Sequence, residues 1–80
     1  MFVLLPQKVQ YIILMQLSSI LKERRQTLGI SQLDLAEMAG IGIATVKSIE
    51  TDKANPSIRT IEALAEVLGL ELTLKIKTTY

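Results

Sequence analysis

The chain has 80 residues, a formal net charge of +1, no cysteine and no histidine. One domain is therefore expected, and neither a disulfide framework nor a thiolate site can form. The lack of histidine removes the commonest metal ligand and the commonest general base near neutral pH, and no carboxylate pair or lysine stands out as a substitute, so we expect no enzyme, no metal and no cofactor.

Residues 1–16 form an N-terminal apolar extension. The stretch resembles a signal peptide only superficially, because no basic residue precedes its apolar part and no small-residue cleavage site follows it. It is also too interrupted to span a bilayer, and we expect a cytoplasmic protein. Two interpretations stay open: the extension packs on a dimer, or translation naturally starts at Met15.

Four segments show the apolar spacing of α-helices. The first covers about residues 17–28 and stops at Gly29, since glycine readily ends a helix in a left-handed conformation. The second begins after Ser31, a good N-cap, has Asp34 in the position of a capping box, and ends at Gly40. The apolar side predicted for the first helix consists of Leu17, Ile20, Leu21 and Leu28.

The third and fourth helices follow a short turn and a loop. The third begins after Gly42 and carries Val46 and Ile49 three residues apart on one side. The fourth begins after the N-cap Ser57, which follows an Asn-Pro pair, and ends at Gly69. Its apolar stripe consists of Ile58, Ile61, Leu64, Ala65 and Leu68.

The hydrophobic period changes after the fourth helix. In residues 70–77, LELTLKIK, apolar and polar residues alternate, which predicts a half-buried β-strand that needs a hydrogen-bonding partner. Phe2–Leu5 or Tyr11–Leu14 could pair with it within the chain, but we favour the same strand of a second copy, antiparallel about a twofold axis. Both can coexist in one sheet. The apolar strand face consists of Leu70, Leu72, Leu74 and Ile76.

The second and third helices are joined by the tight turn Gly40-Ile41-Gly42, which is the layout of a helix-turn-helix. Ala36 is small where the two helices would cross, and Gly40 stands where the turn needs a positive φ. The shared core is predicted to contain Leu35, Ala39, Ile41, Val46 and Ile49. Because all of these matches fall within one short stretch, they strongly indicate a helix-turn-helix.

SQLDLAEMAGIGIATVKSIETDKANPSIRTIEALAEVLGL resembles the helix-turn-helix of the lambda repressor/Cro (XRE) family, and the resemblance covers about residues 17–70. It implies a mainly α, four-to-five-helix DNA-binding domain at 17–69. It also implies that residues 70–80 supply a C-terminal β-strand and tail, with the strand pairing across a dimer in place of the fifth helix of phage repressors. The ending LGLELTLKI is most similar to HipB-type antitoxins and their non-antitoxin relatives, in which the terminal strands of two subunits form a sheet.

The resemblance also implies roles for single residues. Gln32 matches a glutamine that contacts phosphate and sometimes a base, and Thr45 matches a hydroxyl residue that meets phosphate or a base edge. Arg25 and Glu50 match a buried ion pair that locks the first helix to the third, and removing one partner should cost about 3–5 kcal/mol. The implied DNA contacts are Ser31, Gln32, Gly42, Ile43, Ala44, Thr45, Lys47, Ser48, Lys53 and Asn55.

Two positions depart from the family pattern, which commonly has serine and then a polar or basic residue where this chain has Gly42 and Ile43. Apolar side chains can still contact thymine methyl groups, and the shape of a bent operator can add specificity. Plainer interpretations stand beside these contacts: a helix start for Gln32, core packing for Ile43 and a solvated helix face for Lys47.

Three functions are compatible with this pattern. The first is a homodimeric repressor that binds a palindromic operator in double-stranded DNA and is associated with the nucleoid. The second is an antitoxin that neutralises a HipA-like kinase and represses its own operon, for which the neighbouring gene is the test. The third, weaker one is a domain retained for dimerisation alone. Lys22 and Arg24 either meet phosphate or are merely solvated.

Overall fold

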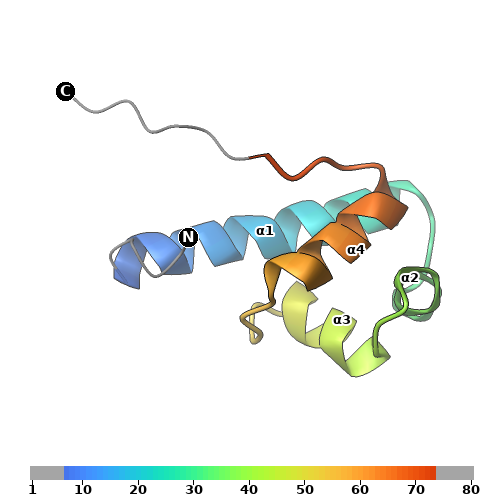
Figure 1. The fold of residues 1–80 in the computed structure, drawn as a ribbon, viewed down its shortest axis with the longest axis horizontal. Helices are drawn as coiled ribbons and strands as arrows, with labels where there is room; N and C mark the ends of the chain where they lie inside the picture. The colour runs from blue at the N-terminus through green and yellow to red at the C-terminus, as the bar shows by residue number, and fades with distance from the viewer. Residues whose placement is uncertain (1–6, 74–80) are drawn as a thin grey trace.

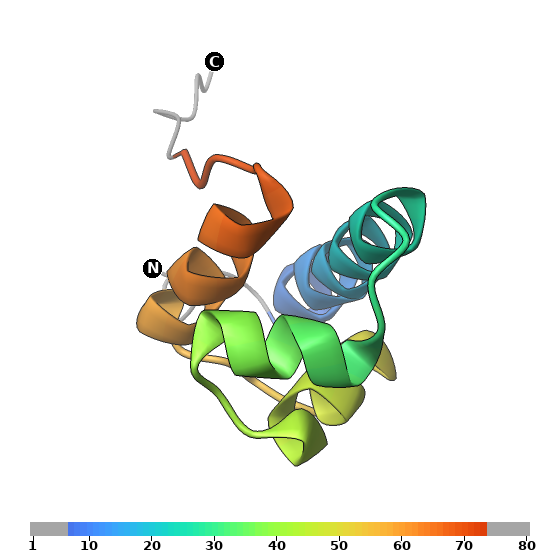
Figure 2. The same ribbon diagram turned by 90° about the vertical axis from the view of Figure 1, so that its right-hand side faces the viewer.

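The computed structural model describes the backbone of residues 7–73 and the side chains of residues 16–73. Four helices follow one another in that part of the chain: α1 (Gln7–Thr27), α2 (Gln32–Ala39), α3 (Ile43–Glu50) and α4 (Ile58–Leu68). α4 lies beside the C-terminal half of α1, and α2 and α3 lie below this pair (Figure 1). Both views show the segment after α4 leaving on the side opposite to α3 (Figure 2).

The helix ends lie where short polar residues and glycines predict them. Ser31 Oγ accepts a hydrogen bond from the Asp34 N–H at 2.9 Å, and the Asp34 carboxylate accepts one from the Ser31 N–H at 3.2 Å, so the capping box is confirmed. Ser57 Oγ accepts the Thr60 N–H at 3.1 Å and caps α4. Gly40 ends α2 with a φ of 71°, in the left-handed region that favours glycine.

α1 begins at Gln7 rather than near residue 17, so the strand candidate Tyr11–Leu14 is wrong: this stretch is helical. A short apolar run has no periodicity that separates a strand from a buried helix. In the helix its backbone hydrogen bonds are satisfied internally, and no strand partner is needed. The other candidate, Phe2–Leu5, lies outside the described residues. Among the helices that the structure describes, none is both long and apolar enough to cross a bilayer.

The hydrophobic core lies where the four helices meet. Its fully buried members come from every helix: Leu21, Leu35, Ala36, Val46, Ile49, Leu64 and Leu68. Ala39 and Ile41 are partly buried against this cluster. The predicted shared core of α2 and α3 is therefore confirmed, and close packing at the small Ala36 leaves it only 2% exposed.

Three residues predicted to lie on apolar stripes are exposed instead. Leu28 follows the last residue of α1 and is 44% exposed, because helical spacing no longer positions a side chain beyond the helix end. Ile58 is the first residue of α4 and is 43% exposed. Ile20 lies within α1 and is 50% exposed, because it borders a surface hollow beside the C-terminal segment.

The segment that follows α4 contains no strand in residues 70–73. Leu70 packs partly on the core, whereas Leu72 is 42% exposed. The rest of the predicted strand, with Leu74 and Ile76, lies outside the described residues. Because a strand is completed by hydrogen bonds from a second strand, pairing across a dimer stays a prediction.

Candidate nucleic-acid interface

A three-residue turn, Gly40-Ile41-Gly42, connects α2 to α3. The Ile41 N–H donates to the Ala36 carbonyl at 3.0 Å, and the Gly40 N–H donates to the Glu37 carbonyl at 3.3 Å. These bonds fix the turn against the last carbonyl groups of α2. The α2–turn–α3 unit therefore has the helix-turn-helix layout predicted from the sequence.

Arg25 on α1 and Glu50 on α3 form an ion pair with two hydrogen bonds. Arg25 Nε donates to Glu50 Oε2 at 2.6 Å, and Arg25 Nη2 donates to Glu50 Oε1 at 2.9 Å. Arg25 Nη1 also donates to the Ile30 carbonyl at 2.8 Å, in the loop that leads into α2. The pair thus joins the ends of α1 and α3 to the start of α2, which is the locking role that the family resemblance implies.

The surroundings of this pair keep both groups charged. Burial raises the pKa of the Glu50 carboxyl. Hydrogen bonds from Arg25 and Gln32 and the positive charges of Arg25 and Lys22 lower this pKa, and their combined effect is larger. The pKa of Glu50 therefore lies below its ordinary value. The hydrogen bond to Glu50 raises the pKa of the Arg25 guanidinium. An ionised Glu50 can only accept hydrogen bonds.

Gln32 is the first residue of α2, and its half-buried side chain reaches the same carboxylate. Gln32 Nε2 donates to Glu50 Oε1 at 3.1 Å. The resemblance implies a DNA contact for Gln32 but says nothing of this bond. Residues 32 and 50 are far apart in the sequence, and no local pattern relates them, so only the fold reveals that they meet.

The predicted contact residues of α3 differ in exposure. Ala44, Thr45 and Lys47 are exposed, and Ser48 is half-buried. Ile43 is also half-buried and packs against the core cluster, so part of this side chain has the plainer role of packing. The exposed part of α3 therefore offers the methyl groups of Ala44 and Thr45, the Thr45 hydroxyl and the Lys47 ammonium group to a partner.

The N-terminus of α3 is open because Gly42 at the N-cap has no side chain. A serine at this position would cover one of the first N–H groups with its hydroxyl. The unbonded N–H groups of a helix N-terminus favour an anion such as a phosphate. Glycine is not required there by φ or by space, because its φ is −72° and an added Cβ would meet nothing nearer than Thr45 Oγ1 at 3.9 Å.

Two further predicted contacts lie in the loop after α3. Lys53 and Asn55 are exposed, whereas Ala54 packs partly on the core. The Lys53 N–H donates to the Ser48 carbonyl at 2.8 Å, and Asp52 takes a left-handed conformation with φ 60°. These features fix the backbone of the loop to the end of α3. Ser31, the remaining predicted contact, is exposed at the start of α2.

Two polar residues of α1 anchor the other helices, and sequence reasoning missed both contacts. Ser18 is buried, and its Oγ donates to the Ile49 carbonyl near the end of α3 at 2.5 Å. Arg24 Nε donates to the Leu68 carbonyl, at the last residue of α4, at 2.8 Å. Arg24 is therefore engaged at the C-terminus of α4, where a positive charge is also favoured by the helix dipole.

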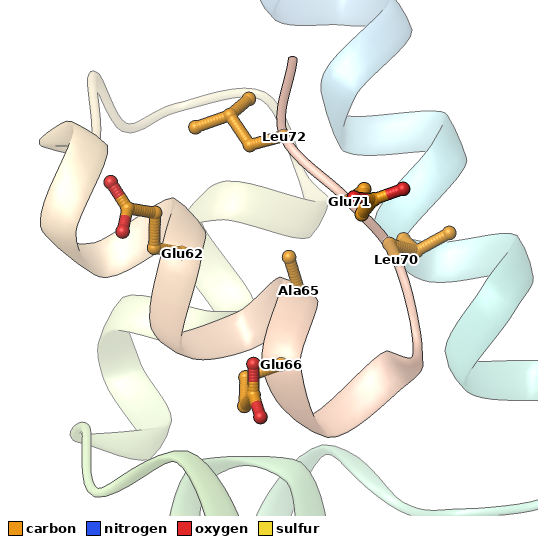
Figure 3. A pocket seen from close by; sticks show the side chains of 6 residues that line it. All are labelled: Glu62, Ala65, Glu66, Leu70, Glu71 and Leu72. Atoms are coloured by element: carbon orange, nitrogen blue, oxygen red, sulfur yellow. The ribbon is translucent and has the colours of Figure 1, made fainter.

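A surface hollow of about 320 Å³ lies between α4 and residues 70–72, and its lining includes the carboxylates of Glu62, Glu66 and Glu71 (Figure 3). Its lining residues come from α4 and from the segment after it, and this segment leaves the helices on the side opposite to α3 (Figure 1). Three carboxylates repel phosphate, so this side is unsuited to nucleic acid. The α2–α3 side, with Lys47 and Lys53, is the candidate interface.

Comparison with known proteins gives consistent matches. Residues 21–75 match the family model described as helix-turn-helix. The chain is 42% identical over 53 residues to the HTH-type transcriptional regulator PuuR of Escherichia coli (strain K12), covering 66% of this chain and 29% of that protein. It is 38% identical over 58 residues to the immunity repressor protein of Bacillus phage phi105, covering 72% and 38%.

A third relative is similar over most of its own length. The chain is 32% identical over 53 residues to an uncharacterized HTH-type transcriptional regulator of Methanothermobacter thermautotrophicus, covering 66% of this chain and 77% of that protein. Of PuuR and the phage repressor, in contrast, the chain spans less than half the length. No solved structure matches the chain significantly.

Proposed function

Because the chain belongs to the lambda repressor/Cro (XRE) family of helix-turn-helix proteins, we propose that it is a transcriptional repressor that binds double-stranded DNA sequence-specifically. The observation that carries the proposal is the α2–turn–α3 unit, whose second helix has exposed Ala44, Thr45 and Lys47. In this layout the second helix enters the major groove. The names of the transcriptional regulators and the repressor among its relatives support the same function.

The proposed contacts divide into two kinds. Ala44, Thr45 and the exposed part of Ile43 meet base edges, where apolar groups read thymine methyls and a hydroxyl can donate or accept. Phosphate contacts come from Lys47 and Lys53 and from the open N-terminus of α3, and they set the position of the protein on the duplex. Ser31, Gln32, Gly42, Ser48 and Asn55 complete the proposed interface.

We further propose a homodimer formed through the C-terminal segment. Apolar residues make up 49% of the chain, which is high for a small domain, and Ile20 and Leu72 are half exposed beside one apolar hollow. A second copy bound on this side leaves α2 and α3 uncovered. Two recognition helices about 34 Å apart would then read a palindromic operator. The proposed dimer contacts are Leu70, Leu72, Leu74 and Ile76.

A gel-shift and footprinting experiment on the region upstream of the chain's own operon tests DNA binding. We expect a protected palindrome and a dimer by light scattering. Lys47→Ala should weaken DNA binding. The control is Lys75→Ala, which gives the same net charge but changes the polar face of the predicted strand, and it should not weaken binding. Absence of any binding at low salt would refute the proposal.

The antitoxin alternative rests on the ending LGLELTLKI and its similarity to HipB-type antitoxins. In this alternative the same dimer also binds a kinase-like toxin and represses the operon that encodes both. A kinase-like gene beside this one, and a stable complex of the two products, would support it. An isolated gene would argue against it.

A further inference from the structure

The Glu50 carboxylate faces Gln32 from inside the protein, on the side away from solvent. The Glu50 side chain is only 3% exposed, and both of its oxygens accept hydrogen bonds from Arg25. Its Oε1 accepts a further bond from Gln32 Nε2 at 3.1 Å. Glu50 therefore has a fixed position, set by α1, from which it holds the first side chain of α2.

The charge of Glu50 decides which way the Gln32 amide is turned. An ionised carboxylate has no proton to donate, so the amide nitrogen and not the amide oxygen must face it. One N–H of Gln32 is then used by Glu50. Glu50 leaves the second N–H and the carbonyl oxygen of Gln32 to other partners.

We propose that Glu50 is a positioning residue for base recognition: it orients the Gln32 amide so that a paired acceptor and donor face the DNA. This arrangement matches the major-groove edge of adenine, where N6–H₂ donates and N7 accepts. The inference rests on the proposed DNA-binding function. It assigns Gln32 to a base contact rather than a phosphate contact, because phosphate oxygens accept hydrogen bonds only and leave the amide oxygen unused.

Selection of binding sites from a random DNA pool tests the inference and does not require that the operator be identified first. Wild type should enrich sites that share a preferred adenine at one base pair. Gln32→Ala should lose the preference at that base pair by about 5- to 150-fold, the range expected for one bidentate contact. Glu50→Gln should lose the same preference at the same base pair, and the double variant should be no worse than Gln32→Ala.

A second Glu50 variant keeps the test valid if Glu50→Gln fails to fold. Glu50→Asp keeps the negative charge beside Arg25 but withdraws the carboxylate from Gln32 by one methylene. Circular dichroism selects conditions in which each variant is folded. Gln16→Ala, which removes an exposed glutamine of α1, is the matched control and should keep the wild-type preference.

The outcomes separate the inference from the function on which it rests. If wild type enriches no sequence, the proposed function fails and the inference with it. If wild type enriches a sequence but folded Glu50 variants weaken binding to all sequences equally, Glu50 acts only on stability and the inference is wrong. It is also wrong if Gln32→Ala keeps every base preference.

Discussion

Arg25 and Glu50, which are 25 residues apart in the sequence, meet through hydrogen bonds of 2.6 and 2.9 Å and tie the end of α1 to the end of α3. Their side chains are 11% and 3% exposed, so neither partner can be fully solvated if the other is removed. The same carboxylate holds Gln32 at the start of α2. One buried carboxylate thus connects α1, α2 and α3.

Removing one partner of this pair should destabilise the fold strongly. Arg25→Ala leaves the Glu50 carboxylate buried without its cation, and the free energy of unfolding should fall by about 3–5 kcal/mol. Urea titration followed by circular dichroism measures the change. Arg59→Ala, which removes an exposed arginine of α4, should change the free energy by less than about 0.5 kcal/mol. Equal effects of the two substitutions would contradict a structural role for the pair.

Glu50 also predicts how stability depends on pH. Because its pKa is lower in the folded chain than the ordinary value of 4.5, the unfolded chain binds more protons and stability rises with pH. The contribution of Glu50 is therefore complete above the ordinary pKa and is lost as pH falls through the lower, folded-state pKa.

The difference in unfolding free energy between wild type and Glu50→Gln should accordingly shrink from about pH 6 to about pH 3. Urea midpoints across this range measure it. Glu66→Gln, which removes an exposed carboxylate of α4, is the control for loss of charge alone. If this difference stays constant with pH, the ionised form of Glu50 does not stabilise the fold more than the protonated form.

The glycines of the turn allow a matched test of backbone strain. Gly40 has a φ of 71° and an added Cβ would meet nothing within 4 Å, so Gly40→Ala costs only the left-handed conformation, about 1–2 kcal/mol. Gly42 has a φ of −72°, and Gly42→Ala should change the free energy of unfolding by less than about 0.5 kcal/mol. Thermal unfolding of the two variants measures both. Equal losses would mean that positive φ is not what position 40 requires.

Local signals explain why much of this fold can be predicted from the sequence. The capping box at Ser31 and Asp34 and the stop at Gly40 involve residues within one or two helical turns, and each depends on the identity of its own residues. The start of α1 could not be predicted in this way. Its apolar run lacks a period, and the sequence has no Ser, Thr, Asp or Asn before Gln7 to indicate an N-cap.

The contacts that organise the candidate site are of another kind. Ser18 with the Ile49 carbonyl, and Arg24 with the Leu68 carbonyl, join residues 31 and 44 positions apart. Every residue has a backbone carbonyl, so the sequence does not indicate which carbonyl accepts a hydrogen bond from a distant side chain. Gln32 and Glu50 could be assigned through the family resemblance, but their mutual hydrogen bond appears only when α2 and α3 are packed.

The proposed interface carries few positive charges, and this predicts a modest salt dependence. Between Ser31 and Ser57 the basic residues are Lys47 and Lys53 alone, so the proposed dimer would bring about four lysines to DNA. The logarithm of the binding constant should then fall with the logarithm of salt concentration with a slope of about −3.6. Lys47→Ala removes two of these charges from the dimer and should bring the slope to about −1.8.

Gel shifts between about 50 and 200 mM salt measure this slope. Lys75→Ala lowers the net charge by the same amount, but this residue lies in the predicted strand and not in the proposed interface. It should therefore leave the slope unchanged. A wild-type slope of about −8 or steeper would mean that lysines and arginines outside α2, α3 and the following loop also bind phosphate. In that case the affinity would come from a wider basic surface, and the α2–α3 unit would mainly supply the choice of sequence.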